Sequence, residues 1–158
     1  MGMSNVRVLH PRCDVTPAEL RERLSRMVLP SRVETQDMVR HIAAIMGVSP
    51  KLAMAHAYIE SGFDAGMVSH TGAVGPMQIV LPSLRWAEKL VGRELDVCST
   101  ADNITAGVAI IRYLQRHTES THEAIAAYHQ GLRSVQRMGP YPSTQKYVLR
   151  VLRAAQRL

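Results

Sequence analysis

The chain has 158 residues, a length that suits a single domain with one hydrophobic core. Apolar residues make up 46% of it and charged residues 20%, a balance typical of a folded chain, and no apolar run approaches the roughly 20 residues that a membrane span needs. Lysine and arginine number 19 against 13 acidic residues, so the net charge of +6 favours polyanionic partners such as nucleic acid, anionic lipid or acidic wall polymers.

The spacing of apolar residues predicts helices along most of the chain and no clear strand pair. The first helix begins with Thr16 and Glu19 as a capping box, and Pro30 stops it. Residues 64–80 break the helical pattern with glycine and proline, and predict a long loop or short irregular strands. We expect helices at about residues 17–28, 38–46, 52–59, 82–91, 102–116, 120–129 and 144–156.

This pattern predicts a mainly α fold. Residues 1–34 are interpreted as a helical appendage or linker, and residues 35–158 as the domain proper. Cys13 and Cys98 form neither a zinc-binding spacing nor a CxxC pair, so one disulfide and two idle thiols both stay open.

Glu60 ends an otherwise apolar helix and stands directly before the glycine-rich loop. Partial burial of a carboxyl there would favour its neutral form and raise its pKa. Such a group can give a proton to a leaving oxygen near neutral pH. By position alone an exposed glutamate at a helix end is the commoner case, so the neighbouring segments must decide.

Several neighbouring residues suit a sugar ligand. Gly75 lets backbone approach a ligand closely, and Gln78 offers both a hydrogen-bond donor and an acceptor. Tyr128 ends a later helix with an aromatic hydroxyl, with a core position as the alternative. Trp86, the single tryptophan, is a candidate sugar platform, although a tryptophan at helical spacing is more often part of a core.

Three segments follow one another along the chain: Glu60–Phe63, Gly72–Ile79 and Ala127–Gly131. Together they resemble the ordered motifs of soluble lytic transglycosylase (SLT) domains, in the lysozyme-like superfamily with a goose-type lysozyme core. The resemblance extends over roughly residues 35–155. It implies a lysozyme-like helical domain with an irregular glycine-rich loop or small β element at the active-site cleft.

The resemblance also implies cleavage of the β-1,4 bond between N-acetylmuramic acid and N-acetylglucosamine in peptidoglycan. The product would be a 1,6-anhydro sugar, and neither a metal nor another cofactor is expected. Glu60 matches the family's single catalytic acid/base. Tyr128 is expected to hydrogen-bond near the acid, and Ser61 to hold the end of the Glu60 helix. The matching substrate-binding positions are Ser61, Gly75, Met77, Gln78, Tyr128 and His129.

The sequence departs from the family's pattern at three places. Pro76 stands where the family usually has an apolar residue such as leucine, His129 where it has asparagine, and Ser143–Thr144 where it has Glu-Thr. These changes bear on substrate binding and pH optimum more than on reaction class. A hydrolysing muramidase such as a phage lysin stays open, with Asp64 or a water in the second role, as does a peptidoglycan-binding module without activity.

Residues 41–57 resemble a helix-turn-helix DNA reader, the main rival. The would-be recognition helix is poor in the arginine, asparagine and glutamine that read bases, so we expect no nucleic-acid partner.

The last helix carries a basic stripe, which is either a solvated face or an attachment to anionic wall polymers. It consists of Lys146, Arg150, Arg153 and Arg157. The expected substrate lies outside the cytoplasm, yet residues 1–11 lack the apolar core of a signal peptide. We therefore expect delivery by a phage, a longer secreted protein or a secretion system.

Overall fold

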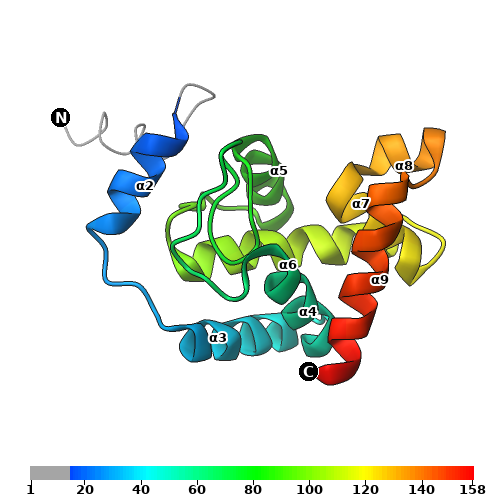
Figure 1. Cartoon of the computed structure of the whole chain (residues 1–158), viewed down its shortest axis with the longest axis horizontal. Coiled ribbons are helices and arrows are strands. Elements are labelled where there is room, and N and C mark those ends of the chain that lie inside the picture. The colour runs from blue at the N-terminus through cyan, green and yellow to red at the C-terminus, as the bar shows by residue number, and fades with distance from the viewer. Residues whose placement is uncertain (1–14) are drawn as a thin grey trace.

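Helices make up most of residues 15–158, the part of the chain that is described by the structure, a computed structural model (Figure 1). The expected mainly α class is confirmed. The helices are α2 (Pro17–Ser25), α3 (Arg32–Ile45), α4 (Pro50–Ser61), α5 (Leu81–Val91), α6 (Thr100–Arg116), α7 (Thr121–Gln130), α8 (Leu132–Met138) and α9 (Pro142–Arg157).

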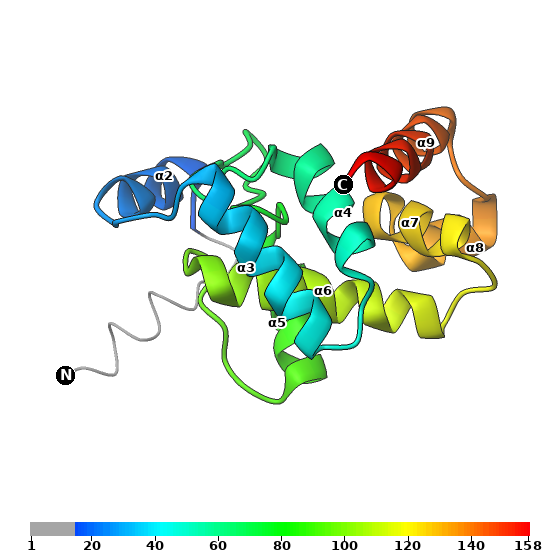
Figure 2. The same cartoon turned by 90° about the horizontal axis from the view of Figure 1, so that it is seen from below.

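The long helix α6 runs through the middle of the molecule, and α3, α5 and α7 pack against it (Figures 1 and 2). It is suited to this place because apolar or small residues occupy nearly every turn, so that it is buried along most of its length. Helix α4 packs against both α3 and α9, and α9 also contacts α7. The end of α4 therefore faces α9 across the interior of the domain.

The first two helices differ from the expected boundaries. Helix α2 ends at Ser25, and Val28, expected on its apolar stripe, is fully exposed. Helix α3 begins at Arg32, six residues earlier than expected, because Ser31 and Glu34 form a capping box that the apolar periodicity does not register.

Helix α8 lies between the helices expected at residues 120–129 and 144–156, in a segment where no helix was expected. Its seven residues are too few to display a helical apolar period, and Val135 alone among them is buried. Gly131 and Gly139, both with positive φ, bound it. Helix α9 begins at Pro142, two residues earlier than expected, with that proline in its first turn.

The glycine-rich segment is irregular, as expected, with a small β element. Val74 forms isolated antiparallel bridges with both Val68 and Ile79. Two further backbone hydrogen bonds, from Gly75 N to Met67 O and from Gln78 N to Gly75 O, close the turns between them.

Residues 15–34 contact the rest of the domain. Leu20 and Leu24 belong to the same hydrophobic core as the other helices. Arg23 binds the Asp96 carboxylate through two hydrogen bonds. The proposed domain boundary at residue 34 stays a prediction. Residues 1–14, with Cys13, lie outside the described part of the chain. Cys98 is buried, and among the described residues it has no disulfide partner.

Helix α4, the would-be recognition helix of the DNA-binding alternative, is buried at every position from Leu52 to Ala57. A helix held in a core in this way cannot enter a DNA groove. None of the helices in residues 15–158 combines the length and apolar character needed to cross a bilayer.

Candidate active site

Glu60 lies in the last turn of α4, where its carboxyl is part of a buried polar cluster. The Tyr147 hydroxyl, from α9, donates a 2.7 Å hydrogen bond to Glu60 Oε2. His56 Nδ1 lies 3.0 Å from the same hydroxyl. Because the Tyr147 hydroxyl donates its hydrogen bond to Glu60, its oxygen accepts a hydrogen bond from His56 Nδ1. This assigns the Nδ1–H tautomer to the imidazole.

Burial sets the protonation states of this cluster. It raises the pKa of Glu60, and the hydrogen bond from Tyr147 opposes that rise in part. Burial lowers the pKa of His56 to about 3, so this imidazole is neutral at ordinary pH. Burial, reinforced by the Glu60 charge, raises the pKa of Tyr147, which keeps its proton. The cluster therefore holds one group able to exchange a proton near neutral pH, the Glu60 carboxyl.

The residue after the acid joins α4 to the glycine-rich loop. Ser61 Oγ donates to the Pro76 carbonyl at 2.8 Å, and is also within 3.2 Å of the Ala57 carbonyl in its own helix. The next residue, Gly62, takes a left-handed conformation that ends the helix, with φ of 63°. Ser61 thus holds the Glu60 end of α4, as the resemblance implied.

Asn103, from α6, fastens the other end of the loop. Its side chain accepts from Met77 N at 3.0 Å and donates to the carbonyls of Val74 and Val97 at 2.8 and 3.0 Å. A Cβ on Gly75 would lie 2.7 Å from the Asn103 amide, so only glycine fits this approach.

Gln78 is one of two non-glycine residues in residues 15–158 with positive φ, here 51°. Its side-chain amide donates to the Gly75 carbonyl at 3.0 Å, which stabilises the turn. An uncommon backbone conformation beside a cleft is typical of a functional position.

Tyr128 binds the loop and not the acid. Its hydroxyl donates to the Met77 carbonyl at 3.0 Å, while the Tyr147 hydroxyl makes the hydrogen bond to Glu60. The hydroxyl that binds the carboxyl thus comes from α9, and the sequence does not reveal that α9 packs against α4.

A cleft of about 360 Å³ opens beside Glu60. Of the predicted site residues, Glu60, Gln78, Tyr128 and His129 line it, whereas Ser61, Gly75 and Met77 are buried behind it. Trp86 also lines the cleft, with its ring edge-on to Tyr113. The rest of the lining comes from Ile79, Val80, Ser83, Ile110, Leu114, Ala127, Gln130, Gly131 and Leu132.

His129 stacks on Tyr147, with ring centroids 4.4 Å apart and planes 20° from parallel. Burial lowers its pKa, which favours the neutral imidazole. The histidine that replaces the family's asparagine therefore contributes an uncharged ring to the cleft wall beside the acid.

Asp64 has a different environment. Its Oδ1 accepts from Gly66 N at 2.9 Å, and its Oδ2 lies 4.0 Å from the Arg32 guanidinium. It is absent from the lining of the Glu60 cleft. Within the described residues, Glu60 is the one carboxylate that lines this cleft.

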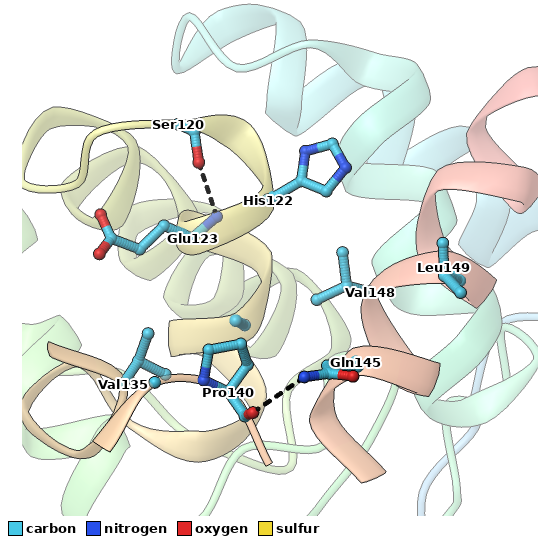
Figure 3. Close-up of a pocket in the computed structure, with 10 residues that line it drawn as sticks. Ser120, His122, Glu123, Val135, Pro140, Gln145, Val148 and Leu149 are labelled. Atoms are coloured by element: carbon cyan, nitrogen blue, oxygen red, sulfur yellow. Dashed lines mark hydrogen bonds between the residues drawn. The ribbon is translucent and has the colours of Figure 1, made fainter. Parts of the chain in front are cut away.

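A second pocket, of about 470 Å³, lies between α7, α8 and α9 (Figure 3). Apolar side chains such as Val135, Val148 and Leu149 line much of it, and two hydrogen bonds border it: Glu123 N to Ser120 Oγ, and Gln145 Nε2 to Pro140 O. It is larger than the Glu60 cleft, but the carboxyl that lines it, Glu123, accepts from Glu119 N at an exposed position and, among the described residues, has no buried tyrosine beside it. The Glu60 cleft is therefore the better candidate active site.

Three residues shape the site although the sequence analysis predicted no role in the site for them. They are His56, Asn103 and Tyr147. The sequence carried one usable signal, since a histidine and an asparagine on otherwise apolar helix faces must find buried partners.

Comparison with known proteins agrees with this geometry. Residues 37–149 match the family described as Transglycosylase SLT domain, and the chain belongs to this family. The structure is also similar to that of an inactive mutant of the lytic transglycosylase Slt from Pseudomonas aeruginosa, with a TM-score of 0.68 and 22% sequence identity. The match covers 75% of this chain and 23% of that one, so this chain spans under a quarter of that protein. The predicted family and the lysozyme-like fold are confirmed.

Proposed function

We propose that this chain is a peptidoglycan lytic transglycosylase in which Glu60 is the single catalytic acid/base. The observation that carries the proposal is the Glu60 carboxyl itself, partly buried at the cleft with a raised pKa and hydrogen-bonded through Oε2 alone. Among the described residues Oε1 has no hydrogen-bond partner, which leaves it for a ligand. Family membership supports the substrate class.

The reaction needs one proton donor that is regenerated. Neutral Glu60 gives its proton to the oxygen that links the muramic C1 to the next sugar, and the C1–O bond breaks. The carboxylate then takes the proton of the muramic C6 hydroxyl, whose oxygen bonds to C1 and closes the 1,6-anhydro ring. Glu60 ends the cycle protonated, no water is consumed, and no metal is required.

The surroundings of Glu60 suit both halves of this cycle. Burial favours the neutral form that donates, and the Tyr147 hydroxyl stabilises the carboxylate that follows. Ordinary glycosidases place a second carboxylate about 5 to 10 Å from the first. The Asp64 side chain, bound to Gly66 and facing Arg32, supports a mechanism in which the substrate supplies the nucleophile.

The proposal also covers where the protein acts and which of its surfaces binds the bacterial cell wall. Peptidoglycan lies outside the cytoplasm, so we infer that the chain acts there. Lys146, Arg150, Arg153 and Arg157 are all exposed on α9, and with the net charge of +6 they support attachment to anionic wall polymers.

The test is mass spectrometry of the products released from purified peptidoglycan. The wild type is expected to release 1,6-anhydromuramoyl products. Glu60→Gln, which removes the transferable proton but nearly keeps the shape, is expected to lose at least about 1,000-fold in rate, near the upper range for general acid catalysis. Glu119→Gln, on an exposed residue outside the cleft, is the matched control.

Other products would contradict the proposal in different ways. A reducing-end product would identify a hydrolase and direct attention to water in the cleft. Binding of peptidoglycan without any product would identify a module that holds the wall. Activity retained in Glu60→Gln would remove Glu60 from the chemistry.

A further inference from the structure

A hollow of about 260 Å³ lies where α4 and α9 meet, separate from the Glu60 cleft. Three arginines of α9 line it, together with two residues from the end of α4. The lining is Tyr58, Ile59, Arg150, Arg153, Ala154 and Arg157. Lys146, the fourth member of the basic stripe, does not line this hollow. The hollow therefore contains only the three arginines of the stripe.

Among the residues that the structure describes, the three arginines have no acidic partner. Elsewhere Arg23, Arg26 and Arg93 lie within 4.0 Å of a carboxylate. Within residues 15–158, none of the arginines in the hollow has such a neighbour or a hydrogen bond. Three unpaired guanidinium groups in one concave site favour an anion, because guanidinium and carboxylate match in shape and charge.

The hollow is close to the proposed acid along both helices. Tyr58 and Ile59 immediately precede Glu60 on α4. Arg150 follows Tyr147, whose hydroxyl binds Glu60, by three residues, or about 4.5 Å along the helix axis. The charge of Arg150 also lowers the pKa of Tyr147, against the larger effect of burial.

The spacing of the arginines suits a short extended peptide. Arg150 and Arg157 are seven residues apart on α9, which is about 10 Å. An extended chain covers that distance in about three residues. Tyr58, about half exposed, adds an aromatic surface beside the charges.

We propose that this hollow binds the carboxylates of the peptide stem carried by the muramic acid residue that Glu60 attacks. The proposal rests on the proposed function, since it places the cut sugar at Glu60. The stem is a short acidic peptide joined to the same sugar, and the hollow gathers three arginines beside the two residues that precede the acid on α4. The family match ends at residue 149, so all three arginines lie beyond it.

The experiment uses the full chain with all three arginines changed, Arg150→Gln, Arg153→Gln and Arg157→Gln. The matched control is Lys89→Gln, Arg116→Gln and Arg137→Gln, which removes the same charge from exposed residues that do not line the hollow. Both are assayed on peptidoglycan free of teichoic acid, with stems intact or removed by an amidase. Circular dichroism verifies that each variant is folded.

The arginine variant is expected to raise KM on intact peptidoglycan about tenfold, equivalent to about 1.4 kcal/mol, with kcat unchanged. On stem-free glycan it is expected to match the wild type, and the control to match it on both. Equal losses on the two substrates, or equal losses in the control, would overturn the proposal in favour of a general charge effect.

A binding measurement keeps the two proposals separable. A free stem tripeptide is titrated into the wild type and the arginine variant by NMR, beside the same peptide with amidated carboxyls and a glycerol phosphate polymer. We expect binding by the wild type alone, weakened by salt and by amidation. Equal binding by both proteins, or preference for the phosphate polymer, would overturn the stem site even if peptidoglycan is cut. Stem binding without any cleavage would uphold the anion site and contradict the proposed function.

Discussion

Two groups of polar side chains around the Glu60 cleft are used in opposite ways. In the loop group, Ser61, Asn103 and Tyr128 all bind backbone groups of the glycine-rich segment. In the α9 group, Tyr147 binds the Glu60 side chain and His56 binds Tyr147. The reason is that an irregular loop leaves backbone groups unpaired, whereas helical backbone is already satisfied and leaves side chains free to act on one another.

This contrast separates residues that maintain the shape of the cleft from residues that adjust the acid. Changes in the loop group should appear mainly in stability, and changes in the α9 group mainly in rate and pH dependence. The following variants test that division, from the largest expected effect to the smallest.

Asn103→Ala is expected to destabilise the fold by about 2 kcal/mol or more, because it leaves the Val97 carbonyl and the Met77 N–H unpaired in a buried site, at about 1 to 3 kcal/mol each. The Val74 carbonyl keeps its hydrogen bond from Ile79 N. Urea unfolding measures the loss. Thr105→Ala is the control on the same helix, since its hydroxyl bonds to the Ala101 carbonyl at an exposed position. A loss of unfolding free energy for Asn103→Ala no larger than that of the control would show that the loop does not depend on the Asn103 hydrogen bonds.

Tyr147→Phe is expected to change the pH dependence of cleavage. Removing the hydrogen bond that lowers the pKa of Glu60 raises that pKa further, so the alkaline limb of the rate profile moves to higher pH. The rate falls by about tenfold, the equivalent of one hydrogen bond to a charged group. Tyr141→Phe, on an exposed tyrosine, is the control. An unmoved alkaline limb would separate Tyr147 from the acid.

Tyr128→Phe is expected to lower stability by about 1 kcal/mol, because the Met77 carbonyl loses its hydroxyl partner. Turnover should fall only a few-fold, and the pH profile should stay where it is. Thermal unfolding and pH-dependent assays measure the two effects. A shifted profile would place Tyr128 with the residues that adjust the acid and break the division.

Glu60→Gln is expected to be slightly more stable than the wild type at neutral pH. The pKa of Glu60 is raised in the folded state, so its contribution is fully present below the ordinary pKa of glutamate and is lost as pH rises through the folded pKa. Melting curves from pH 4 to pH 8 should therefore converge at the acid end and separate above it. A gap that widens toward acid pH would contradict a raised pKa.

The helices were predictable wherever a long apolar period or a cap was present, as in α4 and α6. The short helix α8 was not, because seven residues carry too little periodicity. For the site, the motifs pointed to Glu60, Gln78, Tyr128 and His129, and these four residues line one cleft. Their roles stay predictions.

The partner of the acid shows the limit of sequence-based reasoning. Tyr147 lies 87 residues after Glu60, and nothing in its local pattern distinguishes it from other inward residues of α9. Tyr128 belongs to a recognisable motif, yet its hydroxyl binds the loop.

The sequence by itself determined the family, the helical class and the identity of the candidate acid, because these depend on local periodicity, on caps and on motifs of a few residues. Only the tertiary structure decided which hydroxyl meets Glu60, which residues stand behind the cleft, and that three arginines of α9 share a hollow with the end of α4. Those features depend on how distant helices pack, since burial and hydrogen bonding at each position arise from residues far away in the chain.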